Sequence, residues 1–160
     1  MNAIIYDSPI GRLLLQENQG RLCGVRLLEK EDAPEGDASA SPVLAETAKQ
    51  LSAYFSGKRT AFDLPLSAGG TAFEQAVWRQ LAMIPFGETR TYGQIAQQIG
   101  KPAAARAVGA ACGRNPLLIV VPCHRVLGSS GRLTGFAAGL EAKRTLLALE
   151  GHALRGGRII

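Results

Sequence analysis

The stretch "TYGQIAQQIGKPAAARAVGAACG" (residues 91–113) predicts two short helices joined by a turn. Thr91 followed three residues later by Gln94 is the pattern of a capping box, and Gly100 suits the residue just after a helix. Pro102 is typical of a first helical position, so we expect the second helix to run from there to about Cys112. Two short helices separated by a glycine-containing turn are typical of a helix-turn-helix.

The second of these helices is rich in alanine, and its one large cation is Arg106. A helix that reads base edges in the major groove normally presents several long polar side chains, and this one offers almost none besides Arg106. Its small side chains would instead let the backbone approach a shallow or narrow groove. The residues alone leave open a second interpretation, in which the alanines form an internal face and Arg106 is simply exposed.

A further helix is predicted just before this stretch, from Thr71, which forms another capping box with Glu74, to about Ile84. The residues expected on its buried stripe are Phe73, Val77, Trp78 and Leu81.

The first seventy residues have a different pattern. The runs "AIIYD" (3–7), "RLLLQEN" (12–18) and "LCGVRLLE" (22–29) are separated by turn residues and predict a strand meander. The acidic segment 30–42 is expected to be a loop, and a helix should follow over 43–56. The residues expected along its buried face are Leu44, Ala48, Leu51 and Phe55. The stretch "SAGG" (67–70) is small and flexible, so we predict two domains, 1–68 and 69–160.

Charge is distributed unevenly along the 160 residues. Residues 1–70 carry 7 Lys or Arg and 9 Asp or Glu, whereas residues 71–160 carry 11 and 4, a net charge of +7. A basic half favours a polyanion such as nucleic acid as partner, with a solvated basic surface as the alternative. No apolar run is long enough to cross a bilayer, and no Cys or His spacing predicts a metal site. The cysteine usage and the lack of a signal-peptide pattern indicate a cytoplasmic location.

The chemistry of the chain centres on "VVPCHRV" (residues 120–126), where Cys123 and His124 follow an aliphatic run and Pro122. The aliphatic run predicts a buried strand. A thiol reacts as the thiolate, so Cys123 would need a nearby base at neutral pH. Neighbouring side chains on an extended segment point apart, so we expect a water molecule or a turn to carry the proton between the two groups.

His124 in turn needs an acceptor that orients it, and the basic half offers few acids. Glu150 is the first candidate, because it lies in the last turn of a predicted helix, where a carboxylate opposes the helix dipole. The alternative is an exposed glutamate without a role. Asn115 could be a turn residue or could tie the cysteine loop in place.

These residues resemble a known family. "IPFGETRTYGQIAQQIGKPAAARAVGAACGRNP", "NPLLIVVPCHRV" and "GFAAGLEAKRTLLALEG" look like the O6-alkylguanine-DNA alkyltransferases, also called methylated-DNA–protein-cysteine methyltransferases. The similarity covers residues 71–160, and the N-terminal part matches in general plan. It implies an α/β N-terminal ribonuclease-H-like domain followed by a mostly α C-terminal winged-helix (helix-turn-helix) domain.

The resemblance also implies roles for individual residues around the thiol. Cys123 would be the nucleophile and alkyl acceptor, His124 its base through a water molecule, and Glu150 the group that orients His124. Asn115 would brace the active-site turn.

A second set of roles concerns duplex DNA. By resemblance, Arg106 would enter the duplex and fill the space left by a flipped guanine, and Tyr92 would crowd the phosphate beside it. Ala104 and Ala105 would lie against the minor groove, and we add Thr91 to this DNA-binding set.

The alkyl pocket would be walled by Phe136, Ala137, Ala138 and Lys143, the last matching the family's pocket lysine. Two positions depart from the family pattern, because Phe136 replaces the usual tyrosine and Ala138 the usual glycine. These departures put the rate and the accepted alkyl size in doubt, but not the reaction.

The implied function is DNA repair by a single, stoichiometric transfer of an alkyl group from O6 of guanine to Cys123, after base flipping. Activity on O4 of thymine is left open. The resemblance implies no cofactor and no metal. The implied partner is double-stranded DNA containing O6-alkylguanine, bound by a monomer in its minor groove without a membrane. If the source is prokaryotic, we expect the protein to be associated with the nucleoid.

Three other functions are weighed against this one. A non-catalytic damage-binding relative carries tryptophan at the nucleophile position, and Cys123 argues against it. A winged-helix regulator that uses Cys123 as a redox sensor would need base-reading side chains, which the alanine-rich helix lacks. A cysteine hydrolase would turn over repeatedly on an acyl substrate without DNA.

Overall fold

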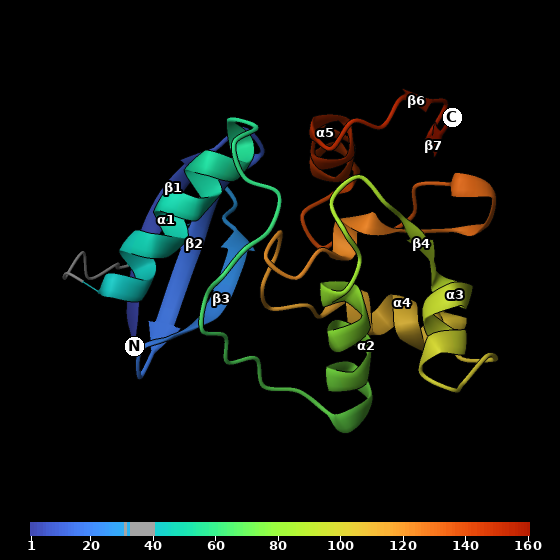
Figure 1. Cartoon of the computed structure of the whole chain (residues 1–160), viewed down its shortest axis with the longest axis horizontal. Coiled ribbons are helices and arrows are strands. Elements are labelled where there is room, and N and C mark those ends of the chain that lie inside the picture. Colours follow the sequence, from blue (N-terminus) through green and yellow to red (C-terminus); the bar gives the residue numbers. More distant parts are fainter. Residues whose placement is uncertain (31, 33–40) are drawn as a thin grey trace. The chain divides into compact units, whose positions relative to one another are not determined.

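The computed structural model describes residues 1–30, 32 and 41–160, and within them the chain divides into two units (Figure 1). The first unit comprises residues 1–69 together with 116–120, and the second comprises 70–115 and 121–160. The loop predicted at 30–42 lies mostly outside the described residues.

The first unit contains the predicted meander. β1 (Asn2–Ser8), β2 (Gly11–Asn18) and β3 (Arg21–Leu27) form an antiparallel sheet in the order β1-β2-β3. Leu15 lies opposite Ile4 on one side and Val25 on the other. Leu15 and Val25 are completely buried, so the central strand supplies the core of this sheet.

One helix, α1 (Pro42–Phe55), packs on this sheet. Ser41 caps it and Pro42 occupies its first turn, so the predicted bounds are correct to within one residue. Its buried face is turned slightly from the predicted one. Thr47 and Tyr54 are buried, whereas the predicted Ala48 and Phe55 are only half-buried. The 3.6-residue period allows either set, and packing against the sheet selects between them.

The aliphatic run before the cysteine is buried, but the prediction of a strand there is wrong. Val25 N donates to Pro116 O (2.8 Å) and Leu118 N to Val25 O (3.1 Å), which gives a single bridge beside β3. The chain then turns at Ile119, whose φ is +71°. The run is apolar because it is buried in the first unit, not because it continues a strand.

The second unit contains most of the helices. Its elements are α2 (Ala72–Ala82), β4 (Arg90–Thr91), α3 (Tyr92–Gln98), α4 (Ala105–Gly113), η1 (Cys123–Arg125), β5 (Val126–Leu127), η2 (Ser129–Gly131), α5 (Leu140–Leu149), β6 (Leu154–Arg155) and β7 (Arg158–Ile159). β4 pairs with β5 in parallel, and β6 pairs with β7 in an antiparallel hairpin.

Both predicted capping boxes are confirmed. Thr71 Oγ1 accepts from Glu74 N at 3.1 Å while Glu74 Oε1 accepts from Thr71 N at 3.0 Å. The equivalent distances for Thr91 and Gln94 are 3.1 and 2.8 Å. These boxes fix where α2 and α3 begin.

The second helix of the helix-turn-helix begins later than predicted. α4 starts at Ala105, and Pro102 instead occupies the second position of a turn closed by Ala104 N donating to Lys101 O at 2.9 Å. A proline with φ near −65° suits this turn position as well as the first turn of a helix, so its sequence signal was ambiguous. The order α3, turn, α4 is as expected.

Trp78 connects α2 to α4. Its indole Nε1 donates to Ala111 O at 2.9 Å, and the side chain is buried. A Cβ at Gly70 would lie 2.6 Å from the same ring, so the chain can enter α2 along this path only as glycine. Among the residues that the structure describes, no helix is both long and apolar enough to span a membrane.

Candidate active site

Cys123 opens a single 3₁₀ turn, η1, rather than an extended segment. Cys123 N donates to Val121 O at 2.9 Å and Arg125 N to Pro122 O at 3.0 Å. Because successive residues of a 3₁₀ turn are about 120° apart, the side chains of residues 123, 124 and 125 leave the turn in three directions. All three are buried, and Cys123 is 2% exposed.

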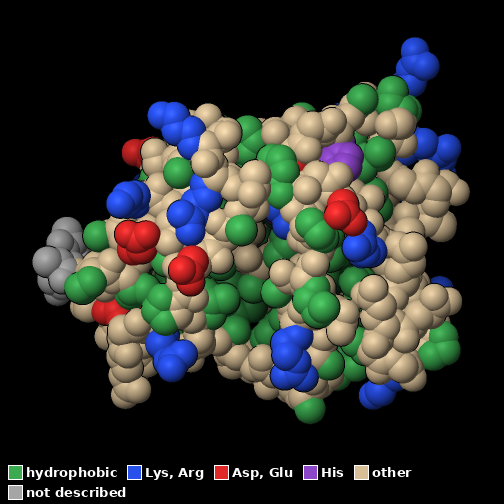
Figure 2. All heavy atoms as spheres, viewed as in Figure 1, with side chains coloured by type: hydrophobic (Ala, Val, Ile, Leu, Met, Phe, Trp, Pro, Cys, Tyr) green, Lys and Arg blue, Asp and Glu red, His purple; other side chains and the backbone are tan. Residues whose placement is uncertain are grey.

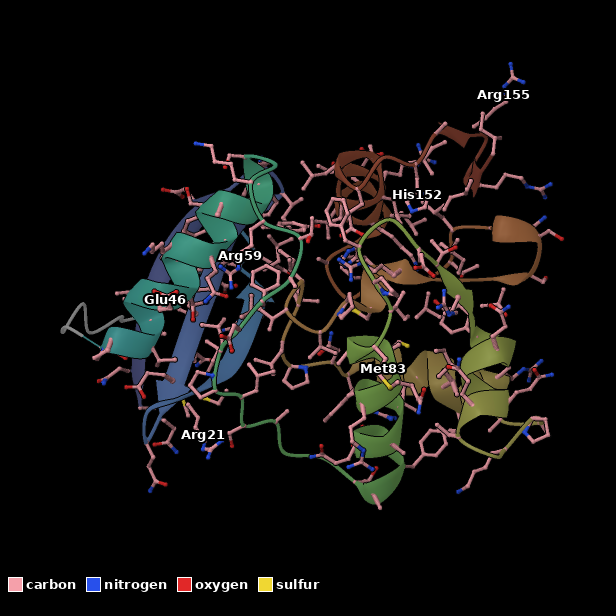
Figure 3. The ribbon with its side chains drawn as sticks, viewed as in Figure 1. Arg21, Glu46, Arg59, Met83, His152 and Arg155 are labelled. Carbon is pink, nitrogen blue, oxygen red and sulfur yellow. The ribbon has the colours of Figure 1, made fainter. Side chains whose placement is uncertain are left out.

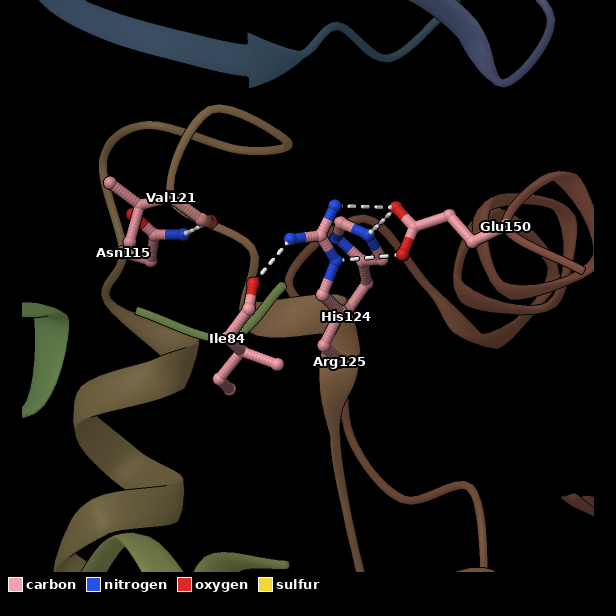
Figure 4. Close-up of polar contacts among 6 residues, drawn as sticks. All are labelled: Ile84, Asn115, Val121, His124, Arg125 and Glu150. Atoms are coloured by element: carbon pink, nitrogen blue, oxygen red, sulfur yellow. Dashed lines mark hydrogen bonds and ion pairs between the residues drawn. The ribbon is translucent and has the colours of Figure 1, made fainter. Parts of the chain in front are cut away.

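Asn115 fastens this turn to the end of α4. Its side-chain amide donates to Val121 O at 2.8 Å, two residues before Cys123 (Figure 4). A hydrogen bond from Asn115 is also one of the influences that lower the pKa of Cys123. The predicted site residues Asn115 and Cys123 therefore come together.

His124 and Glu150 meet as well, and the structure adds Arg125 to them (Figure 4). His124 Nε2 lies 2.7 Å from Glu150 Oε2. Arg125 donates to the same carboxylate through Nε (2.7 Å to Oε1) and Nη2 (3.0 Å to Oε2). Its Nη1 donates to Ile84 O at 2.6 Å. Glu150 caps the C-terminus of α5 and is 4% exposed, so the ion pair between Arg125 and Glu150 is buried inside the protein.

The network fixes the tautomer of His124. An ionised Glu150 can only accept hydrogen bonds, so the proton of a neutral imidazole must lie on Nε2. Nδ1 is then a lone-pair acceptor, and it is buried without a hydrogen-bond partner in the described chain. Burial lowers the pKa of His124, and the opposing effect of Glu150 is smaller. His124 is therefore a neutral base with one acceptor nitrogen available.

The protonation state of the resting thiol is set mainly by burial. Burial raises the pKa of Cys123 to about 11, although Asn115 and Lys143 act in the opposite direction. Burial likewise lowers the pKa of Lys143 to about 8. Desolvation outweighs the favourable neighbours, so Cys123 is protonated at neutral pH and its proton must be removed during the reaction.

A pocket of about 940 Å³ lies in the same unit. Its lining includes Thr91, Tyr92, Ala105, Arg106, Phe136 and Ala137 from the predicted sets, together with Thr134. The other predicted residues are not among those that line it: these are Ala104, Ala138 and Lys143, and the buried group Asn115, Cys123, His124 and Glu150. The ring of Phe136 also lies edge-on to the imidazole of His124, with centroids 6.5 Å apart. Phe136 thus connects the pocket wall to the buried network.

Lys143 supports the part of the pocket wall that Thr134 and Gly135 form. Its ammonium donates to Val126 O (2.7 Å), Thr134 O (2.8 Å) and Gly135 O (3.4 Å). Thr134 Oγ1 in turn donates to the hydroxyl of Tyr92 at 3.3 Å. Three backbone carbonyls thus satisfy a fully buried cation, which ties the segment after η2 to β5.

Sequence reasoning missed Arg125 and Thr134. Arg125 is the fourth letter of "PCHR", and a cation next to two buried groups was the available signal. Thr134 carried no signal, because its contact with Tyr92 spans 42 residues. Within the described residues, no cluster of three or more His, Cys, Asp or Glu could hold a metal ion.

Comparison with known proteins places both parts of the chain. Residues 1–68 match the family model described as 6-O-methylguanine DNA methyltransferase, ribonuclease-like domain, and residues 72–152 match the DNA binding domain of the same family. The predicted fold class and the predicted family are both confirmed.

Individual relatives agree with these matches. A methylated-DNA–protein-cysteine methyltransferase of Mycolicibacterium paratuberculosis is 51% identical over 146 residues, covering 90% of this chain and 88% of the relative. One of Methanosarcina acetivorans is 47% identical over 150 residues, covering 92% and 96%. The crystal structure of Mycobacterium tuberculosis OGT in complex with DNA has a TM-score of 0.84 at 47% identity and covers 94% of this chain and 92% of that one.

Proposed function

The chain belongs to the 6-O-methylguanine DNA methyltransferase family, and we propose that it repairs duplex DNA by transferring an alkyl group from O6 of guanine to its own Cys123. The observation that carries this proposal is the buried thiol beside a neutral histidine whose tautomer is fixed by Glu150. The proposal needs no cofactor, since the protein itself is the acceptor.

The transfer step breaks one bond and forms one. The sulfur of Cys123 attacks the alkyl carbon, an S–C bond forms, and the bond between that carbon and O6 breaks with its electron pair going to guanine. The thiol gives up one proton and the departing guanine gains one. The product is a thioether, which water does not hydrolyse under ordinary conditions, so each molecule acts once.

Four residues around the thiol have a role in removing its proton. A water molecule between Sγ and Nδ1 of His124 would pass the proton to the imidazole, because Nδ1 is the acceptor left available. Glu150 would stabilise the imidazolium that forms, and Arg125 would keep Glu150 ionised in the meantime. Asn115 would hold the turn and favour the developing thiolate.

DNA binding falls to the helix-turn-helix. α4 would lie in the minor groove with Ala104 and Ala105 against the sugar edges, since small residues allow this close approach. Arg106 would take the place of the flipped guanine, with Thr91 and Tyr92 beside the displaced phosphate. The alkylated base would enter the pocket of about 940 Å³ along Phe136 and Ala137, with Lys143 fixing that wall and Ala138 next to it.

The substrate is thus double-stranded DNA that carries O6-alkylguanine, with O4-alkylthymine as a second target to be tested. We place the protein in the cytoplasm, as a monomer, and at the nucleoid if the source is prokaryotic.

Mass spectrometry tests the reaction directly. After incubation with a duplex containing O6-methylguanine, we expect the protein to gain the mass of one methyl group, on the peptide that bears Cys123, and Cys123→Ser to gain none. A methyl group on Cys23 or Cys112, or several guanines repaired per molecule, contradicts the mechanism. Binding without any mass gain would indicate a damage-binding protein instead.

A further inference from the structure

Three exposed arginines lie in register at the C-terminal end of the second unit. In the β6–β7 hairpin, Arg155 lies directly opposite Arg158. Arg158 is also bridged to Arg132, which follows η2, in an antiparallel arrangement. β7 therefore lies between the other two segments. Residues directly opposite each other in antiparallel strands project to the same face, so Arg132, Arg158 and Arg155 form one row, called here the arginine row.

The backbone under the arginine row is well fixed. Leu133 N donates to Gly157 O at 2.8 Å, and Gly128 N donates to Arg132 O at 2.8 Å. Gly156 and Gly157 have φ of 58° and 76°, as a tight hairpin turn with two left-handed residues requires. The alternate residues point the other way into an apolar cluster, which consists of Leu127, Leu133, Leu147, Leu154 and Ile159. The row is therefore the outer face of a small two-sided sheet, not a flexible tail.

The charge of this row is not balanced within the described part of the protein. None of its guanidinium groups forms an ion pair or side-chain hydrogen bond with another described residue, and all three residues are exposed. Figure 2 shows basic side chains at the corner where the C-terminus lies in Figure 1, and in Figure 3 Arg155 points away from the other elements of the second unit. Like charges directly opposite each other on a sheet destabilise it. Folding does not require this arrangement, and an external anion would balance it.

We propose that the arginine row binds backbone phosphates of duplex DNA beside the nucleotide being repaired. The segment that supplies Arg132 also supplies Ser129, Ser130 and Thr134 to the pocket, so the row continues from the pocket rim. The planar guanidinium matches phosphate in shape and charge. This inference rests on the proposed function, and it adds a second DNA contact outside the helix-turn-helix.

The contact between the arginine row and DNA phosphates can be measured by the salt dependence of binding to an undamaged duplex. Each phosphate neutralised contributes about 0.9 to the slope of log K against log salt. The triple variant Arg132→Gln, Arg155→Gln, Arg158→Gln should lose about 2–3 from this slope, and at 0.1 M salt it should bind at least about tenfold more weakly. The matched control is Arg21→Gln, Arg26→Gln, Lys58→Gln, which removes three exposed positive charges from the first unit. We expect its slope to stay at the wild-type value.

Two further measurements separate binding from folding. Replacing the same three arginines by lysine keeps the charges, so most of the slope should return. The melting temperature of the glutamine variant should be unchanged or higher, because repulsion within the row is removed. The proposal is overturned if the glutamine variant keeps the wild-type salt slope, or if the control variant loses as much of the slope as the glutamine variant does.

The proposed function fails in a different way. If wild-type protein does not transfer methyl groups to Cys123, the repair mechanism is wrong whatever the salt slope. If wild-type protein transfers normally while the glutamine variant keeps its full slope, only the arginine row is wrong.

Discussion

Arg125 and Arg158 show how the same side chain is used in two regions of one unit. Arg125 is buried, and its donors reach both oxygens of Glu150 and a backbone carbonyl. Arg158 is exposed and has an arginine opposite it on either side. In the first region a cation balances an anion of the protein itself. In the arginine row the cations have no such anion among the described residues, and we propose that the phosphates of DNA balance them. A buried charge therefore reports on internal chemistry, and an exposed row of like charges reports on a partner.

The strongest test of the buried region is Glu150→Gln. It removes the charge that stabilises the imidazolium of His124, so methyl transfer should slow by about 10²–10⁴-fold. Binding to undamaged duplex should stay close to wild type, because the network does not face the pocket. Single-turnover transfer rates and a binding titration measure the two effects. The matched control is Glu141→Gln, an exposed carboxylate on the same helix, which should transfer at the wild-type rate. Normal transfer by Glu150→Gln removes Glu150 from the mechanism.

An identical substitution in both regions makes the comparison direct. Arg125→Gln leaves Glu150 buried and unbalanced, which should lower the free energy of unfolding by about 3–5 kcal/mol. Arg158→Gln should change it by no more than about 0.5 kcal/mol, and in the stabilising direction. Urea denaturation of the two variants and the wild type provides the numbers. Equal losses of stability would mean that the two arginines are not used differently.

The smallest effect concerns Lys143, a buried cation held only by carbonyl groups. Its pKa is lowered to about 8 from 10.5, so above pH 8 the unfolded chain binds more protons at this residue than the folded chain does. The stability contributed at Lys143 therefore rises with pH between about 8 and 10.5. At about 1.36 kcal/mol per pKa unit, we expect an increase of up to about 3 kcal/mol over this window.

The reference for this measurement is Lys143→Met, which cannot titrate. Denaturation curves of both proteins at several pH values give the difference, which includes the effect of Lys143 on the neighbouring thiols of Cys123 and Cys112. A difference that does not change with pH would show that Lys143 keeps its ordinary pKa in the folded protein.

The parts of the fold that could be predicted are those whose causes are local. The capping boxes of α2 and α3 join residues three positions apart, so the sequence contains the whole interaction. Pro102 suits both the first turn of a helix and the second position of a turn. The hydrogen bond from Ala104 N to Lys101 O shows that it occupies a turn. The aliphatic run 117–121 was predicted wrongly as a strand because the bridge from Leu117 to Val25, some ninety residues earlier, decides its conformation.

The site divides in the same way. Glu150 could be identified because a carboxylate at the end of a helix conflicts with its local surroundings. For Arg125 the sequence offered only a cation next to two buried groups, and not its partners, because Glu150 and Ile84 lie 25 and 41 residues away. The raised pKa of Cys123 was equally hidden, because it depends on burial by the completed fold.

The hydrogen bond from Trp78 to Ala111 gives the protein an optical reporter. The chain has one tryptophan, so its indole fluorescence comes from a single buried side chain whose Nε1 is bound to the backbone of α4. Water entering beside this ring would shift the emission to longer wavelength. Any movement of α4 that breaks the bond can thus be followed in unlabelled protein, in real time, through one native chromophore.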